Sequence, residues 1–345
     1  MSKAAELAAL IGSQTALSNR NLIINGAMQV AQRGDVTGVT TGYGGADRYQ
    51  FARAGAAEVT LSQDTDVPSN QGFAYSQKVD VTTADSSLAA DDYALLLYRM
   101  EGFDCQQFLY GTNAAKKVTV QFWVKSPKTG THIVEAFHGD ASYHNSQSYT
   151  IATANTWQKV TLTFDGYQTT AFDNDNGFGL QISWWLASGT TYASGTLTED
   201  AWHNTNANRA VGQVNVMDST SNAFYLTGFQ LEVGEQATSF EHRSFADELY
   251  RCKRYYNDII PSNSVALAWH IAGNSSVNRR LNFSYPEMRA TPSATFSSSS
   301  VGSYGTNYPA LNNPSNKFTE VNMSLSANSD SNYTWLTAMS LDAEL

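Results

Sequence analysis

Apolar and polar side chains alternate along many short segments of this chain, and this alternation constrains the fold more than any other feature. In residues 118–125 the even positions are Val, Val, Phe and Val, and the odd ones are polar apart from Trp123. Residues 180–187 repeat the pattern, with Trp185 on the polar side. Successive strand residues point to opposite faces, so each segment buries one face and presents the other. We therefore predict antiparallel strands.

Strand candidates recur between residues 49 and 233, separated by turn residues such as Gly44-Gly45 and Asp165-Gly166. Charged residues make up only 15% of the chain and aromatic residues 12%, which suits strands joined by polar turns better than charged helices. This pattern predicts a jelly-roll β-sandwich over residues 21–243. Residues 19–25 are expected to enter a first strand, and the further candidates are 49–52, 74–81, 93–100, 117–125, 131–138, 157–164, 179–186 and 223–233.

A helix is predicted at residues 244–260, where Ser244 and Asp247 resemble a capping box. Phe245, Leu249, Cys252 and Tyr256 fall on one helical stripe. Beyond Pro261 the strand pattern resumes at 265–271, 279–285, 291–297, 318–325 and 333–341. We expect residues 261–345 to form a second, smaller β-domain.

The first 20 residues contain another helical pattern, which spans Ala4 to Leu17. A helix of this length is marginal alone in water, so it must pack on something. One interpretation is packing on its own body, and the other is a short parallel coiled coil with copies of itself. In the second case it would serve attachment or trimerisation through Leu7, Leu10, Ile11 and Leu17.

Charge and composition exclude several classes of protein. Lys and Arg total 21 against 31 Asp and Glu, a net charge of -10, and no basic cluster is visible, so nucleic acid is not an expected partner. No segment has the roughly 18 apolar residues of a membrane span, and the start of the sequence does not fit a signal peptide. We expect synthesis in a cytoplasm and no membrane insertion.

Cys105 and Cys252 are expected to be buried free thiols.

Four segments resemble a family of bacteriophage tail-fibre and related virion proteins. They are NLIINGAMQVAQRG (21–34), ADRYQF (46–51), FYLTGFQLEVGEQATSFEHRSFADELYRCKRYY (224–256) and YPEMRATPSATF (285–296). The resemblance implies a carbohydrate-binding-module-like jelly roll, a connecting helix and a C-terminal β-domain. It also implies a non-enzymatic virion component, usually homotrimeric.

This resemblance leads to the expected function of a tail-fibre-like protein in the virion. Its N-terminus would dock to other tail or capsid proteins, and its β-domains would recognise host surface glycans without covalent chemistry. One alternative is a non-adhesive structural virion protein, such as a head fibre, a decoration protein or a baseplate adaptor. Another is a glycan-degrading tailspike, although no regular repeat of 20–50 residues is visible.

Aromatic side chains are the most informative functional candidates, because sugar rings pack their C–H faces on Trp and Tyr while polar neighbours orient the hydroxyls. Trp123 and Trp185 lie on polar strand faces, but an outward Trp can equally be buried under a loop or in a trimer interface. The candidate carbohydrate-binding residues on strands are Trp123, Trp185, Gln121, Gln181 and Lys125. Loop candidates are Tyr192 and Trp202, together with Tyr143, His144 and His203.

Catalytic and metal-binding patterns are weak. The sequence contains no His-rich metal spacing, no G-x-S-x-G and no phosphate-binding Gly loop, so no enzyme activity and no cofactor are expected. Glu232, Glu235 and Glu241 would serve a glycosidase only if two carboxylates faced each other across a cleft. Asp173 and Asp175 in DNDNG are a calcium candidate, and the alternative is an Asx-rich turn.

Overall fold

A computed structural model describes residues 19–261, 267–270, 279–301, 310–312, 314–323 and 333–345. The chain divides into two compact units. The first unit extends to Glu248 and also includes Leu345, and the second comprises Leu249–Glu344. The predicted N-terminal helix and its residues Leu7, Leu10, Ile11 and Leu17 lie outside the described residues.

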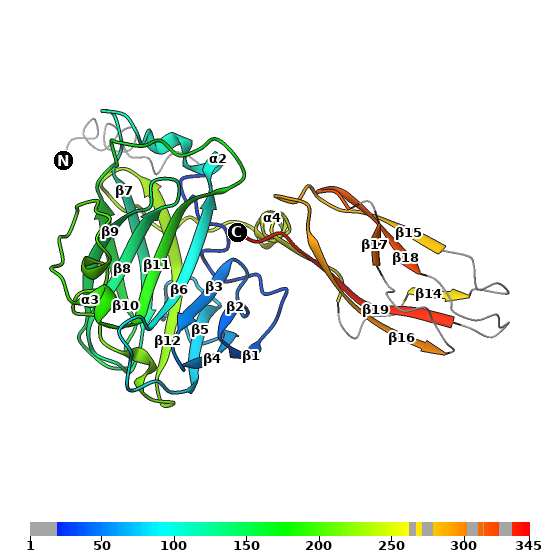
Figure 1. Ribbon diagram of the computed structural model, residues 1–345, viewed down its shortest axis with the longest axis horizontal. Helices are drawn as coiled ribbons and strands as arrows, with labels where there is room; N and C mark the ends of the chain where they lie inside the picture. Colours follow the sequence, from blue (N-terminus) through cyan, green and yellow to red (C-terminus); the bar gives the residue numbers. More distant parts are fainter. Residues whose placement is uncertain (1–18, 262–266, 271–278, 302–309, 313, 324–332) are drawn as a thin grey trace. The chain divides into compact units, whose positions relative to one another are not determined.

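The first unit is an antiparallel β-sandwich of two six-stranded sheets stacked in two layers (Figure 1). Most successive strands alternate between the sheets, and this confirms the predicted jelly-roll sandwich. In spatial order, the first sheet contains β1 (Val36–Val39), β4 (Glu58–Asp64), β5 (Ser76–Thr83), β12 (Ala223–Val233), β7 (Val118–Lys125) and β10 (Gln158–Phe164). The second sheet contains β2 (Thr41–Tyr43), β3 (Tyr49–Ala54), β6 (Tyr93–Glu101), β11 (Phe178–Ser188), β8 (Gly130–His138) and β9 (Tyr143–Ile151).

The sandwich core forms where the apolar faces of the two sheets meet. Phe122 of β7 and Trp184 of β11 are fully buried, and their ring centroids lie 5.5 Å apart in an edge-to-face contact. Phe229 of β12 packs on the other side of Trp184, with centroids 4.8 Å apart. The alternation of residues 118–125 and 180–187 therefore predicted the inward faces of β7 and β11 correctly.

Several parts of the sandwich differ from the sequence prediction. Residues 19–25 form no strand, because the chain turns at residues 24–27. At this turn Asn25 adopts a left-handed backbone conformation, and its side chain bonds both the N–H and the carbonyl of Val30. Strands β1, β2, β4 and β9 were not predicted. Tyr143 and His144, expected in a loop, begin strand β9 instead.

Short helical turns connect the strands of the first unit. These are α2 (Gly102–Cys105), η2 (Gln106–Phe108), α3 (Thr190–Ala193), η3 (Asn206–Asn208) and η4 (Val216–Asp218).

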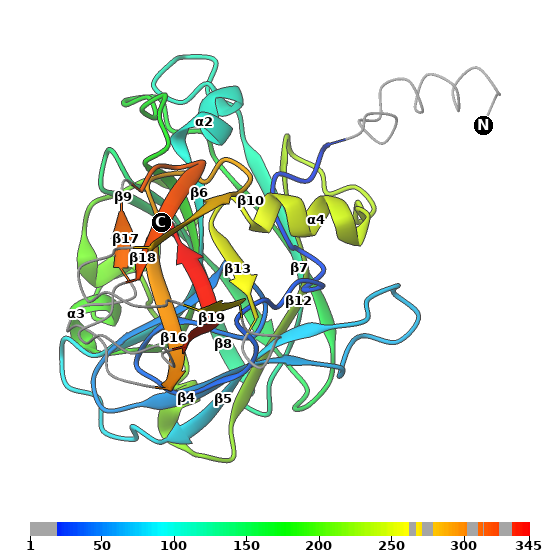
Figure 2. The ribbon, with the colours of Figure 1, turned by 90° about the vertical axis from the view of Figure 1, so that its right-hand side faces the viewer.

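Helix α4 (Phe245–Cys252), visible along its length in Figure 2, begins where the capping pattern predicts. The N–H of Asp247 donates to the hydroxyl of Ser244 at 3.2 Å. The predicted helix of residues 244–260 is nevertheless too long, because α4 ends at Cys252 and residues 256–260 form strand β13. Residues 256–260 instead pair with β19, and this pairing satisfies their backbone hydrogen-bonding groups.

The second unit is built of antiparallel strands, as expected, and Figure 2 shows β16 and β19 side by side. One of its sheets contains β13 (Tyr256–Ile260), β19 (Tyr333–Asp342), β14 (Leu267–His270) and β16 (Ser293–Val301). The other contains β15 (Arg279–Ser284), β18 (Phe318–Met323) and β17 (Ala310–Asn312).

Two further sequence predictions concern thiols and membranes. Cys105 and Cys252 are both buried thiols outside any disulfide, as predicted. Among the described residues, no helix is long and apolar enough to cross a membrane.

Candidate functional site

A row of four side chains crosses the outer face of the second sheet. Strand register places Arg99 of β6 beside Gln181 of β11, Gln181 beside Phe137 of β8, and Phe137 beside His144 of β9. Because all four strands alternate, these side chains point away from the core. The row therefore combines a cation, an amide and two flat rings on one surface.

Residues 189–214, here called the covering segment, lie over part of this outer face. At its two ends the N–H of Gly189 donates to the carbonyl of Asp92, and the N–H of Val214 to that of Thr131. In its middle His203 forms an antiparallel bridge with His144 on the edge strand β9. The segment thus covers the outer face as well as the β9 edge, which would otherwise present unpaired backbone groups.

One ion pair joins the covering segment to the sheet beneath it. The Arg209 guanidinium donates from Nε and Nη2 to the two carboxylate oxygens of Glu135, each at 2.8 Å. Burial of Glu135 would raise its pKa, but Arg209 and the adjacent His144 outweigh this and lower the pKa to about 2. Glu135 is therefore ionised at neutral pH and completely buried.

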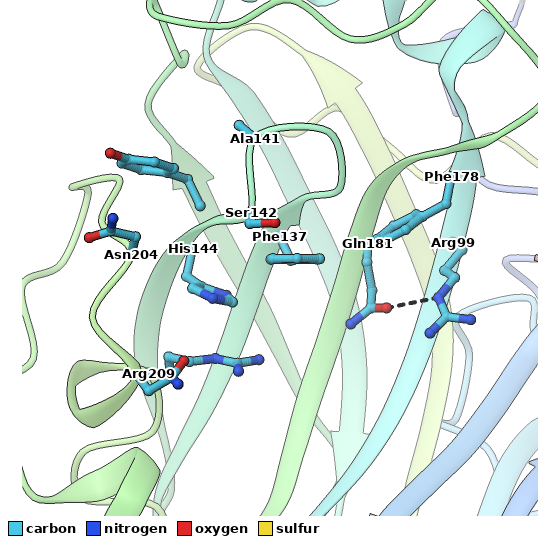
Figure 3. A pocket seen from close by; sticks show the side chains of 11 residues that line it. Arg99, Phe137, Ala141, Ser142, His144, Phe178, Gln181, Asn204 and Arg209 are labelled. Carbon is cyan, nitrogen blue, oxygen red and sulfur yellow. Dashed lines mark hydrogen bonds between the residues drawn. The ribbon is translucent and has the colours of Figure 1, made fainter.

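The larger hollow on this face has a volume of about 580 Å³ and includes the row described above (Figure 3). Phe137 stacks on His144 with centroids 4.7 Å apart, and Phe178 lies 5.7 Å from Phe137. The Arg99 guanidinium lies 5.2 Å from the centre of the Phe178 ring and donates from Nε to the Gln181 side chain at 2.9 Å. Its wall thus combines aromatic rings with polar groups whose positions are fixed by hydrogen bonding.

A smaller hollow of about 240 Å³ adjoins it, and Arg99, Gln181 and Arg209 line both. Its own wall contains the rings of Tyr93 and Tyr192, whose centroids lie 5.8 Å apart in an edge-to-face contact. Because three residues are shared, the two hollows form one continuous surface, here called the outer groove.

The outer groove is chemically suited to hydroxylated rings. Flat aromatic faces bind the apolar C–H faces of such rings, and the shared polar side chains can exchange hydrogen bonds with hydroxyls. The Arg209 cation is already neutralised by Glu135, so it serves as an oriented donor rather than as an isolated charge.

Five of the predicted carbohydrate-binding residues meet in the outer groove, and two of them, Tyr143 and His144, line the larger hollow. Gln181 lines both hollows, and Trp185 and Tyr192 line the smaller one. Trp185 is only 1% exposed because Tyr192 and Arg209 of the covering segment pack on it, at 5.4 Å and 5.1 Å from its ring. The outward Trp is thus largely buried under a loop, which was the alternative interpretation of its position.

The other strand candidates lie elsewhere. Gln121, Trp123 and Lys125 belong to β7 and face outward from the first sheet, so the structure does not bring them together with Gln181 and Trp185. Lys125 forms an ion pair with Asp66 and lies 4.3 Å from the centre of the Tyr225 ring.

The other two loop candidates, Trp202 and His203, do not line the outer groove. Trp202 packs on Tyr110 and Tyr167, with ring centroids 5.8 Å and 5.4 Å away, and its Nε1 donates to the carbonyl of Asp165. His203 pairs with β9 through its backbone.

The calcium candidate forms a hydrogen-bonded turn. The N–H of Gly177 donates to the Asp175 carboxylate at 2.8 Å, which is an Asx turn. The backbone carbonyl of Asp173 accepts a bond from the Gln106 side chain. Within the described part of the chain, no group of three or more His, Cys, Asp or Glu side chains is arranged to hold a metal ion.

Several residues of the outer groove were not predicted from the sequence, namely Tyr93, Arg99, Phe137, Phe178 and Arg209. Alternation in residues 93–100 and 131–138 was a usable signal, since it places Arg99 and Phe137 opposite the buried positions of their strands. No comparable signal exists for Arg209, because it lies in irregular chain.

Comparison with known proteins yields distant structural neighbours. No family model and no curated protein matches the chain. A tailspike protein 4 enzymatically active domain from bacteriophage CBA120 is similar with 13% identity and a TM-score of 0.35, over 62% of this chain and 21% of that one. A family 11 carbohydrate-binding module of a cellulase of Clostridium thermocellum has 12% identity and a TM-score of 0.29, over 61% and 98%. TmCBM61 in complex with β-1,4-galactotriose has 9% identity and a TM-score of 0.32, over 62% and 99%. The chain spans about a fifth of the tailspike chain that it matches.

Proposed function

We propose that the first unit binds an oligosaccharide in the outer groove without cleaving it. The observation that carries this proposal is the sharing of Arg99, Gln181 and Arg209 by two adjoining hollows, each walled by aromatic rings. An extended ligand with several hydroxylated rings can contact both aromatic walls while its hydroxyls bond the shared polar side chains.

Affinity electrophoresis of the full chain tests this function. The gels contain mannan, galactan, xylan, mixed-linked β-glucan or alginate. We expect at least one polysaccharide to retard the wild type, and Gln181→Ala and Phe178→Ala to migrate faster in it. Thr60→Ala, on the outer face of the first sheet, is the control and keeps the wild-type mobility. Equal retardation of all variants, or no retardation in any gel, would contradict the proposal.

We propose that no bond is cleaved in the outer groove, and the surroundings of Glu135 support this. Its carboxylate is fully buried and bonded to Arg209, so it is not available to water or to a glycosidic oxygen. Incubation of the chain with the retarding polysaccharide should release no new reducing ends. Their appearance would favour the glycan-degrading tailspike.

For the biological setting, we propose a homotrimeric adhesin on a bacteriophage virion, with its N-terminus attached to other tail or capsid proteins. The resemblance of residues 21–34 and 224–256 to virion proteins supports this, and the outer groove would then bind host surface glycans. Weak sites gain avidity when several copies are tethered together. Immunogold labelling of purified particles and sedimentation of the full chain test location and copy number. Labelled particles that bind no host cells would instead favour a non-adhesive structural virion protein.

A further inference from the structure

The outer face of the first sheet is also crossed by an extended segment, which contains residues 235–243. The Thr238 carbonyl accepts a bond from Gln121 Nε2 at 2.8 Å, and the N–H of Glu241 donates to Gln230 at 2.8 Å. At the margin of this segment lies a third hollow of about 270 Å³, beside Trp123. It belongs to the sheet opposite the outer groove and shares no residue with it.

Three aromatic side chains form one wall of the third hollow. The Phe73 ring lies 5.0 Å from Phe240 and 5.3 Å from His242, and the latter two are 4.8 Å apart. Burial lowers the pKa of His242, so this ring is neutral at pH 7. The wall is therefore a cluster of uncharged rings contributed by two distant segments of the chain.

A β-bulge shapes the floor between this wall and Trp123. The pairing of β12 with β7 shifts register between Thr227 and Gln230, and Gly228 within this bulge has a φ of +62°. A Cβ at Gly228 would lie 2.6 Å from the Phe73 ring and 3.0 Å from Trp123. Glycine therefore lets both rings lie close over the backbone, and bulges of this kind often re-aim side chains beside binding sites.

An unpartnered acceptor lines the same hollow. Gln121 is 1% exposed, and its Nε2 is fixed by the Thr238 carbonyl, so the amide orientation is determined. Its Oε1 is buried and has no hydrogen-bond partner. A buried acceptor without a donor is unfavourable, and a ligand that supplies an O–H or N–H would relieve this.

We infer that the third hollow binds a single pyranose ring. The ring would lie with its C–H face against Trp123 and the aromatic wall, and one hydroxyl would donate to Gln121 Oε1. The hollow has less than half the volume of the larger hollow of the outer groove, which suits one ring rather than a chain. This site is independent of the proposed function, and together the two sites would let one copy engage two glycans from opposite faces.

Indole NMR of the ¹⁵N-labelled full chain tests the inference, with the Trp123 resonance assigned by Trp123→Phe. The probes are N-acetylglucosamine and the methyl glycosides of glucose, galactose and mannose. We expect a saturable shift of the Trp123 resonance with at least one of them, about tenfold weaker in Gln121→Leu. Gln181→Ala, in the outer groove, should leave the shift unchanged.

No shift with any of the four sugars, or an equal response of Gln121→Leu, would overturn the inference. Should Gln121→Leu fail to fold, Phe240→Ala replaces it, because it removes part of the wall and leaves the Gln121 hydrogen bond intact. Retardation by a polysaccharide without a Trp123 shift rejects this site and leaves the proposed function standing. A Trp123 shift without any retardation supports this site and contradicts the proposed function.

Discussion

Arg209 clamps both carboxylate oxygens of Glu135, with Nε and Nη2 each 2.8 Å from an oxygen. Glu135 lies on β8 and is fully buried, whereas Arg209 belongs to the covering segment and also lines the outer groove. The same side chain therefore holds the covering segment on the sheet and lines the groove for which we propose glycan binding. Stability of the segment and shape of the groove are coupled through this one pair.

Glu135→Gln should lower the free energy of unfolding of the first unit by about 3 kcal/mol, because it leaves the Arg209 cation, whose side chain is 17% exposed, without its partner. Urea unfolding followed by near-ultraviolet circular dichroism measures the change. Arg209→Met should lower the free energy of unfolding by a similar amount, because it leaves the Glu135 carboxylate buried without its partner.

The double variant Glu135→Leu with Arg209→Met is the matched control. It should be more stable than either broken pair, because paired charges are often replaceable by apolar groups of similar size. A loss equal to the sum of the losses in Glu135→Leu alone and Arg209→Met alone would show that the residues act separately.

Stability should fall as the solution is acidified below pH 4.5. The pKa of Glu135 is about 2 in the folded chain, against an ordinary value of 4.5 in the unfolded chain. Its contribution is complete above pH 4.5 and is lost as the pH falls toward 2, because the unfolded chain takes up the proton first. Urea midpoints measured between pH 7 and 2 should fall more steeply in the wild type than in Glu135→Gln.

His132 should produce a second pH dependence at higher pH. Burial lowers the pKa of His132 from 6.5 to about 4, while a bond to the Lys128 carbonyl opposes the change. During acidification the unfolded chain binds this proton near pH 6.5, whereas the folded chain binds it only near pH 4. Stability therefore declines as the pH falls from 6.5 to 4. The slope reaches about 1.4 kcal/mol per pH unit. His132→Gln should flatten the profile in this range, and an unchanged profile would exclude His132 as its source.

The strand faces were predictable because a period of two residues fixes which side chains are inward. Phe122 and Trp184 were correctly placed in the core on this basis alone. The period does not say which strands share a sheet, however. Trp123 and Trp185 have the same pattern, yet β7 and β11 belong to opposite sheets, because strand order is decided by contacts distant in sequence.

What covers a face was equally hidden from the sequence. Trp185 points outward and is still only 1% exposed, since residues of an irregular segment pack over it. Arg209 and Phe240 lie in such segments, where neither helical nor strand periodicity applies. Tyr256 continues a helical stripe and nevertheless forms a strand, because pairing with Asp342 on β19 outweighs local propensity.

Gly26→Ala tests the packing of the turn near the start of the sandwich. The N–H of Phe229 donates to the Gly26 carbonyl at 2.9 Å, and a Cβ on Gly26 would lie 2.1 Å from the Phe229 carbonyl oxygen. One backbone must move, so we expect a loss of about 1–3 kcal/mol in urea unfolding. Gly34→Asn is the control, because the space around Gly34 is open and Asn tolerates its φ of +65°. Equal stability of both variants would refute this packing.

Affinity for the outer groove should depend on the length of the oligosaccharide. Phe178 lines only the larger hollow and Tyr192 only the smaller one, so a ligand that spans both contacts both rings. Phe178→Ala and Tyr192→Ala should each weaken binding of a long oligosaccharide by about 1–2 kcal/mol in calorimetric titration. The affinity for a ligand confined to one hollow should fall in only one of the two variants. If each variant weakens the binding of short and long oligosaccharides by the same amount, the two hollows do not act as one groove.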